Sequence, residues 1–176
     1  MAADPPRRVR RRRPPRRPAR RGRSGRPGGV VTIGHSAGGH LALLDAARDA
    51  GDATVRPRAV VGIAPITDVL RAHALGSGET IEAFLGGGPD DLPDVYEAAS
   101  PALQVPLGVP QLLVHGDHDE HVSAEVAADH VGAAREAGDD AVFELSAGHD
   151  HFTVVEPGST AWAAVLAYLD GVAGAD

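Results

Sequence analysis

One serine in this chain lies in a setting that favours nucleophilic chemistry. Ser36 is the centre of the stretch Gly34-His35-Ser36-Ala37-Gly38, a G-x-S-x-G pattern that directly follows the β-branched run Val30–Ile33. A serine on a sharp turn between a strand and a helix presents its hydroxyl above the sheet, and flanking glycines leave room for the crossing backbone. The amides at the start of the helix favour developing negative charge. We therefore interpret Ser36 as a nucleophile and Gly34, His35 and Gly38 as its turn.

A serine nucleophile needs a general base, and the base needs an acid that orients it. Two acids and then two histidines follow the last two predicted strands: Asp117 and Asp119, then His149 and His151. The chain order serine, acid, histidine is typical of such a site when the nucleophile lies on a strand-to-helix turn. The residues alone leave the choice within each pair open, and Asp68 is a weaker third candidate for the acid.

The elements that must position these side chains alternate between strand and helix. Four short apolar runs predict buried strands, and these are Val30–Ile33, Ala59–Ala64, Leu112–His115 and Ala141–Leu145. Strands that are separated by helices predict an α/β fold, a predominantly parallel sheet with helices on both faces. In such sheets the chemistry gathers at the carboxyl ends of the strands, which is where the candidate residues lie.

Three helices complete this pattern. The first is predicted from Ala37 to about Asp49, with Leu41, Leu44 and Arg48 on one side and Gly51 as its stop; the second runs from about Ala124 to Ala137, with Ser123 as N-cap and Gly138 as stop. The closing helix carries apolar residues at helical spacing, which are Trp162, Val165, Leu166 and Leu169.

The stretch Thr67–Gln104 interrupts the alternation. It is rich in Gly, Pro and Asp, and only scattered apolar side chains could pack. A long excursion that leaves one strand end and returns to the next often covers a site. Two interpretations stay open: a lid, or a surface loop with short helices.

Residues 1–29 differ in composition from the rest of the chain. They contain 12 of the 17 arginines, and the chain has no lysine. A segment with so little apolar surface predicts disorder, because no packed core offsets its loss of conformational entropy. We consider three origins: a misread or truncated start, an unstructured tail, and a basic arm that binds nucleic acid. The domain division is therefore 1–29 as this segment and 30–176 as the catalytic portion.

The remaining chain is strongly acidic. From Pro27 onward five arginines face 23 acidic residues, a formal charge of −18. Such a body repels nucleic acid, which makes nucleic acid an unlikely partner. The chain has no cysteine, so neither disulfides nor thiol chemistry contribute. No apolar run is long enough to span a membrane and no secretion signal is recognisable, so we expect a cytoplasmic protein.

Longer motifs resemble those of the α/β-hydrolase superfamily. The segment His115-Gly116-x-x-Asp119-x-x-Val122 is similar to the HG-x-x-D-x-x-V segment of many esterases and prolyl-oligopeptidase-like enzymes. His151-Phe152 resembles the catalytic His-Phe pair of these enzymes. The stretches FLGG, which begins at Phe84, and Ala99-Ser100-Pro101 resemble carboxylesterase- and arylformamidase-like members. The resemblance runs from about Val30 to the end of the chain.

This resemblance implies a catalytic triad of Ser36, Asp119 and His151, and it selects these two over Asp117 and His149. It also implies that the Ala37 N–H donates to the oxyanion. The expected function is hydrolysis of a carboxylic ester through an acyl-enzyme, without a cofactor; an aryl formamide or a short peptide is the alternative substrate.

The resemblance further implies a His-Gly-Gly loop before the nucleophile, which the sequence lacks. One lost oxyanion donor typically costs ~10²–10³ in rate. We therefore expect the chain to form only a portion of the fold and to have weakened activity. We also expect its first strand to be exposed and the chain to tend to form homodimers.

Two further interpretations belong to other classes of function. One is a binding protein or inactive fragment with the same fold. The other is a metal-dependent hydrolase that uses His115, His118 and His121, which stand three residues apart. The second requires a helix at these residues, whereas Gly116 after a buried strand favours a loop.

Overall fold

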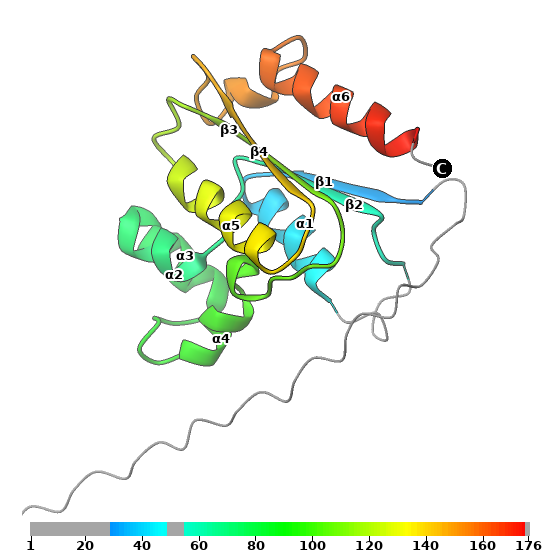
Figure 1. Ribbon diagram of the computed structural model, residues 1–176. Coiled ribbons are helices and arrows are strands. Elements are labelled where there is room, and N and C mark those ends of the chain that lie inside the picture. Colours follow the sequence, from blue (N-terminus) through cyan, green and yellow to red (C-terminus); the bar gives the residue numbers. More distant parts are fainter. Residues whose placement is uncertain (1–28, 49–54, 175–176) are drawn as a thin grey trace, which may run out of the picture.

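A four-stranded parallel sheet forms the centre of the molecule (Figure 1). The computed structural model describes residues 29–48 and 55–174. The strands lie in the order β1-β2-β3-β4, and each pairs in parallel with its neighbour. Their bounds are Val31–His35 for β1, Ala59–Ile63 for β2, Gln111–Gly116 for β3 and Ala141–Ser146 for β4. The predicted strands are confirmed to within two residues at either end.

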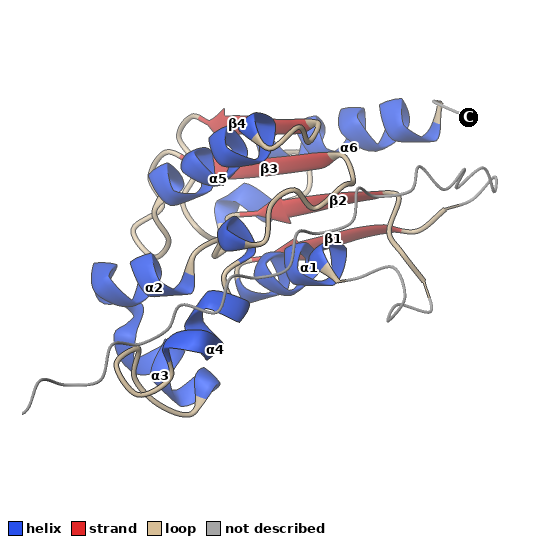
Figure 2. Ribbon diagram, turned by 60° about the horizontal axis from the view of Figure 1, so that its bottom comes forward, coloured by secondary structure: helices blue, strands red, loops and turns tan. Residues whose placement is uncertain are grey.

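Helices cover both faces of this sheet, as the α/β pattern predicts (Figure 2). On one face, α1 (Ala37–Ala47) and α5 (Ala124–Glu136) pack against Val60 and Leu113. On the other face, α6 (Thr160–Ala173) and the short 3-10 helix η3 (Thr153–Val155) pack against Val61, Leu112 and Val114. Successive strand residues point to opposite faces, and the apolar runs of β2 and β3 are buried on both faces of the sheet. The prediction of buried strands is wrong for much of β1 and β4, which have a neighbour on one side only among the described strands and are partly exposed.

The side of α1 that carries Leu41 is not the side that packs on the sheet. Leu41 is 54% exposed, whereas His40, Leu43 and Ala46 are buried. Helical spacing of apolar residues fits two faces here, and the spacing alone does not show which one faces the sheet. Arg48 caps the end of the helix, and the predicted stop at Gly51 lies outside the described residues.

The predicted limits of the second helix agree with α5 to within about one residue. Ser123 occupies the N-cap position of α5, although its side chain makes no capping hydrogen bond. Gly138 follows α5 with a φ of +95°, a conformation that glycine adopts without strain. In α6 Val165 is fully buried, while Leu166 is 49% exposed.

The excursion between β2 and β3 folds into short helices on the same side as α1 and α5 (Figure 1). They are α2 (Val69–Ala72), the π-helical turn η1 (His73–Ser77), α3 (Gly78–Leu85), α4 (Pro93–Ala98) and the 3-10 helix η2 (Pro101–Leu103). Val69, Ile81 and Tyr96 form a small core of their own. A hydrogen bond of 2.7 Å from His40 Nε2 to the Ala99 carbonyl ties the excursion to α1. Its action as a lid stays a prediction.

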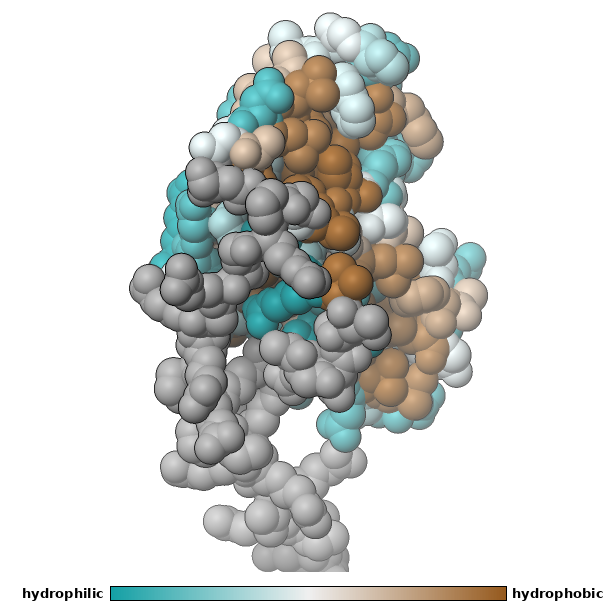
Figure 3. Space-filling model, turned by 90° about the vertical axis from the view of Figure 1, so that its right-hand side faces the viewer, coloured by the Kyte–Doolittle hydropathy of each residue, from teal (hydrophilic) through white to brown (hydrophobic). Residues whose placement is uncertain are grey.

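β1 lies at one edge of the described sheet. Val30 and Ile33 are 50% and 42% exposed. Hydrophobic side chains gather in a band on the face of the molecule that Figure 3 shows. Homodimer formation through such an edge stays a prediction. The segment 1–28 lies outside the described residues, and no helix among those described is long and apolar enough to cross a membrane.

Candidate active site

Ser36 lies at the tip of the turn between β1 and α1. Its φ of +53° is unusual for a residue other than glycine, so the serine backbone is held in a strained conformation. The Ser36 N–H donates to the Ile63 carbonyl at 2.9 Å, and the Ser36 carbonyl accepts from the His40 N–H at 3.0 Å. These two bonds fix the turn to β2 and to the first turn of α1. Ala37 begins this helix, where backbone N–H groups have no acceptor within the helix.

The glycines around Ser36 differ in what they allow. A Cβ at Gly34 would lie 2.1 Å from the Gly38 carbonyl oxygen, so only glycine fits there. A Cβ at Gly38 would meet nothing within 4 Å, so the prediction that this glycine leaves room for the crossing backbone is wrong. The second crowded position is Gly39, whose Cβ would lie 2.9 Å from the Gly34 oxygen and from Pro65. The elbow therefore requires Gly34 and Gly39.

The structure brings the three predicted triad residues into one hydrogen-bonded chain. Ser36 Oγ lies 3.0 Å from His151 Nε2, and His151 Nδ1 lies 2.7 Å from Asp119 Oδ2. Because a carboxylate only accepts, the proton of the neutral imidazole resides on Nδ1. Nε2 is then left as the acceptor for the Ser36 hydroxyl. This is the tautomer that a general base requires.

The Asp119 side chain is fully buried and accepts hydrogen bonds from several donors. Its Oδ1 accepts from the backbone N–H groups of His121 and Val122, each at 2.9 Å. Burial tends to raise the pKa of this carboxyl, but the hydrogen bonds from Val122, His151 and His121 outweigh burial and lower the pKa below its usual value. Asp119 is therefore charged at neutral pH.

The other member of each predicted pair has a structural contact instead. Asp117 Oδ1 accepts from the Gly148 N–H at 2.7 Å, and so ties the loop after β3 to the loop after β4. His149 Nδ1 contacts Ser146 Oγ at 3.1 Å, and the His149 carbonyl accepts from the His118 N–H at 3.0 Å. Asp68, the third candidate acid, caps α2 through its Oδ1.

Gly116 explains why the two loops lie so close together. A Cβ at this position would lie 2.1 Å from the His149 carbonyl oxygen. The glycine in the His115-Gly116 pair therefore allows the loop that carries His151 to approach the loop that carries Asp119.

Rings pack around His151 in a way that the sequence did not reveal. The His35 ring centroid lies 4.6 Å from that of His151, and His35 Nε2 bonds the His151 carbonyl at 2.8 Å. Burial lowers the pKa of His35, which therefore makes this contact as a neutral donor. His121 and Phe152 each lie 5.3 Å from His151, centroid to centroid. The only sequence signal for these contacts is that these residues neighbour the triad members in the chain.

The three histidines of the metal interpretation do not converge. His115 is buried against Asp119, the His118 side chain is 71% exposed beside Asp117, and His121 packs against His151 and Phe152. The described residues contain no group of three or more His, Cys, Asp or Glu that could hold a metal ion. Other histidines have partners elsewhere: His130 Nε2 bonds the Gln111 side chain, and His73 pairs with Glu82.

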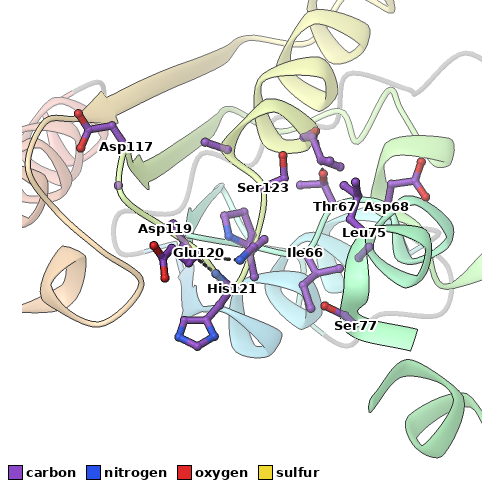
Figure 4. A pocket seen from close by; sticks show the side chains of 16 residues that line it. Ile66, Thr67, Asp68, Leu75, Ser77, Asp117, Asp119, Glu120, His121 and Ser123 are labelled. Atoms are coloured by element: carbon purple, nitrogen blue, oxygen red, sulfur yellow. Dashed lines mark hydrogen bonds between the residues drawn. The ribbon is translucent and has the colours of Figure 1, made fainter. Parts of the chain in front are cut away.

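A cavity of about 340 Å³ adjoins the site (Figure 4). It lies between the loop that follows β3, including Asp119 and His121, and the start of the excursion, including Ile66 and Leu75. Ser36 and His151 are not among its lining residues. The cavity therefore borders the triad on the side of the acid and does not contain the nucleophile.

The parallel sheet, the strand-to-helix turn at Ser36 and the chain order of the three residues define the class: this is an α/β-hydrolase fold. Residues 26–130, more than half of the chain, match the family model named BD-FAE, and the chain belongs to that family of α/β-hydrolase-type esterases. This confirms the superfamily that the motifs indicated.

Solved structures share the fold. An esterase from the Planctomycetes species Thermogutta terrifontis, Est2 with bound propionate, matches at 24% identity with a TM-score of 0.60, over 80% of this chain and 53% of its own. A truncated carbohydrate esterase from gut microbiota matches at 22% identity with a TM-score of 0.69, over 84% of this chain and 61% of its own. The acylaminoacyl peptidase of Pyrococcus horikoshii matches at 14% identity with a TM-score of 0.69, over 82% of this chain and 24% of its own.

The chain thus spans about half the length of the first of these proteins. A search of curated proteins found no significant match.

Proposed function

We propose that this chain is a serine hydrolase that cleaves carboxylic esters through an acyl-enzyme on Ser36. The observation that carries the proposal is the position of His151, whose Nε2 lies 3.0 Å from Ser36 Oγ while its Nδ1 lies 2.7 Å from Asp119 Oδ2. Membership of an esterase-type family supports the substrate class. The strained backbone of Ser36 supports its role as the nucleophile.

In the first half of the reaction, His151 Nε2 accepts the Ser36 proton as Oγ bonds to the ester carbon. The carbonyl oxygen becomes an oxyanion, and the Ala37 N–H donates to it. Asp119 stabilises the imidazolium. His151 then gives the proton to the departing alkoxide oxygen as the C–O bond breaks, which leaves an acyl group on Ser36 and releases an alcohol.

In the second half, a water molecule replaces the alcohol. His151 accepts a proton from this water as its oxygen attacks the acyl carbon. The bond between that carbon and Ser36 Oγ then breaks, and Oγ regains a proton from His151. The products are a carboxylic acid and the unmodified serine.

The test is hydrolysis of p-nitrophenyl acetate by the full chain and its Ser36→Ala variant. Removing the nucleophile is expected to lower kcat by at least about 10³-fold, because the three residues act as a unit. Ser123→Ala is the matched control, since the Ser123 side chain makes no capping hydrogen bond, and it should leave turnover unchanged. Equal turnover by Ser36→Ala and the parent chain would refute the proposal. A parallel assay with an aryl formamide and a short peptide ranks the alternative substrates.

A further inference from the structure

A second histidine contacts the triad acid from the side of the sheet. His115, the fifth residue of β3, is fully buried. Its Nε2 lies 3.1 Å from Asp119 Oδ2, the same oxygen that His151 Nδ1 contacts at 2.7 Å. Its Nε2 also lies 3.0 Å from the Val122 carbonyl oxygen. Asp119 Oδ2 therefore lies between two imidazole rings.

The surroundings of His115 determine which of its nitrogens carries the proton. Both atoms near Nε2 are acceptors, a carbonyl oxygen and a carboxylate oxygen. If Nε2 carried no proton, its lone pair would face the lone pairs of these two oxygens. Nδ1 is buried, and no partner for it is found among the described residues. A buried N–H without an acceptor is rarer in proteins than an acceptor with a free lone pair. The ring is therefore neutral, with its proton on Nε2.

The position of His115 gives this contact a rigid origin. The other donors to Asp119 come from the loop itself, at His121 and Val122, and from His151. His115 instead belongs to β3, paired with Leu145 of β4. A donor anchored in the sheet fixes the carboxylate relative to the strands, whereas donors in its own loop move with it.

From this geometry we infer that His115 is a positioning residue: its Nε2–H, shared between the Val122 carbonyl oxygen and Asp119 Oδ2, holds Asp119 Oδ2 where that oxygen orients His151. This inference rests on the proposed function. Burial lowers the pKa of His115, and this outweighs the opposing contacts with Val122 and Asp119. The ring consequently stays a neutral donor throughout the pH range in which a serine hydrolase works.

Two substitutions at His115 distinguish a role as hydrogen-bond donor from a role in packing alone. His115→Gln keeps an N–H that can reach the position of Nε2, whereas His115→Leu fills the site without a donor. We expect His115→Leu to lower kcat about tenfold, and His115→Gln to recover most of that loss. We also expect the acid limb of the kcat/KM profile to move to higher pH in His115→Leu. Without the second donor, Asp119 keeps more of its negative charge for the imidazolium of His151.

Other titratable groups also face His151 and must be kept constant in this comparison. They are His35 from the end of β1, His121 from the loop after β3, and Asp119 itself. None is altered in the two variants, so a difference between their profiles reports on the donor at position 115.

A readout that does not need turnover is the NMR spectrum of the full chain with ¹⁵N-labelled histidine. We expect His115 to show the Nε2–H tautomer and a slowly exchanging proton, whose signal moves in Asp119→Asn. A proton on Nδ1 of His115, or a signal unaffected by Asp119→Asn, would overturn the inference. So would a folded His115→Leu variant with an unchanged kcat and acid limb, or a loss of kcat that His115→Gln does not restore.

These outcomes are distinct from failure of the proposed function. Turnover that does not depend on Ser36 refutes the serine hydrolase, whatever the NMR signal of His115. Turnover that depends on Ser36, together with a His115 proton on Nδ1, refutes only the positioning role.

Discussion

The loops after β3 and β4 each carry two residues of the same type, two positions apart, and the members of each pair do different work. His151 contacts Ser36 and Asp119 contacts His151, and both side chains are buried. Asp117 accepts from the Gly148 N–H and so ties one loop to the other, while the His149 ring contacts Ser146 at the end of β4 and its backbone carbonyl accepts from the His118 N–H. The comparison teaches that the role of a carboxylate or an imidazole here follows from its partners. Asp117 and His149, the outer pair, make contacts that hold the two loops in place. Asp119 and His151, the inner pair, are aligned within these loops.

The largest effect should come from breaking the inner pair. Asp119→Asn replaces the acceptor of the His151 Nδ1–H with an amide that can favour the wrong tautomer, and should lower kcat by about 10³–10⁴-fold. Asp117→Asn removes the negative charge but keeps an Oδ1 that accepts from the Gly148 N–H, and should lower kcat less than about tenfold. Steady-state hydrolysis of p-nitrophenyl acetate, with thermal unfolding of each variant, measures both. Equal losses of kcat in the two variants would contradict the distinction between the pairs.

The same kind of comparison applies to the glycines of the elbow. Gly34→Ala places a Cβ 2.1 Å from the Gly38 oxygen, and should lower the free energy of unfolding by about 4 kcal/mol or more, or prevent folding. Gly38→Ala meets open space and should change stability by less than about 1 kcal/mol. Urea unfolding followed by circular dichroism measures the difference. Similar midpoints for the two variants would show that the turn differs from the one described.

His130 is a buried histidine that lacks a carboxylate partner, and can be compared with His151, which contacts Asp119. His130 bonds the Gln111 side chain, and burial lowers its pKa from 6.5 to about 4. The unfolded chain therefore takes up a proton below about pH 6.5, while the folded chain does so only near pH 4. Stability is lost as the pH falls through this window, by up to about 3 kcal/mol.

His130→Gln, which keeps a donor to Gln111, should remove that part of the pH dependence. Unfolding free energies of the parent chain and the variant at pH 7, 5.5 and 4.5 measure it. Parallel curves across these values would mean that His130 titrates in the same range in both states.

The sequence predicted much of the fold because its signals are local. The strands, the helix after Ser36 and the stop at Gly138 follow from short runs of residues and from the conformations that glycine allows. The triad candidates followed from their places after strands, and the choice within each pair came from the resemblance to known motifs.

Other features depend on contacts between segments far apart in the chain. The exposed side of Leu41 depends on how α1 packs on the sheet. The crowding at Gly39 depends on Pro65, 26 residues further along. His35 lies beside Ser36 in the chain, yet its contact with His151, 116 residues further along, arises only when the loop after β4 meets the end of β1.

The most direct test of the central claim is covalent labelling of the full chain with a fluorophosphonate, followed by mass spectrometry of its peptides. The reagent needs an activated serine, so we expect one adduct, on Ser36, that forms rapidly in the parent chain and in His149→Ala. In His151→Ala it should form at least about 10²-fold more slowly, because the base is lost. An adduct on another serine, or labelling of Ser36 at the same rate without His151, would contradict the assignment of these residues as a catalytic unit.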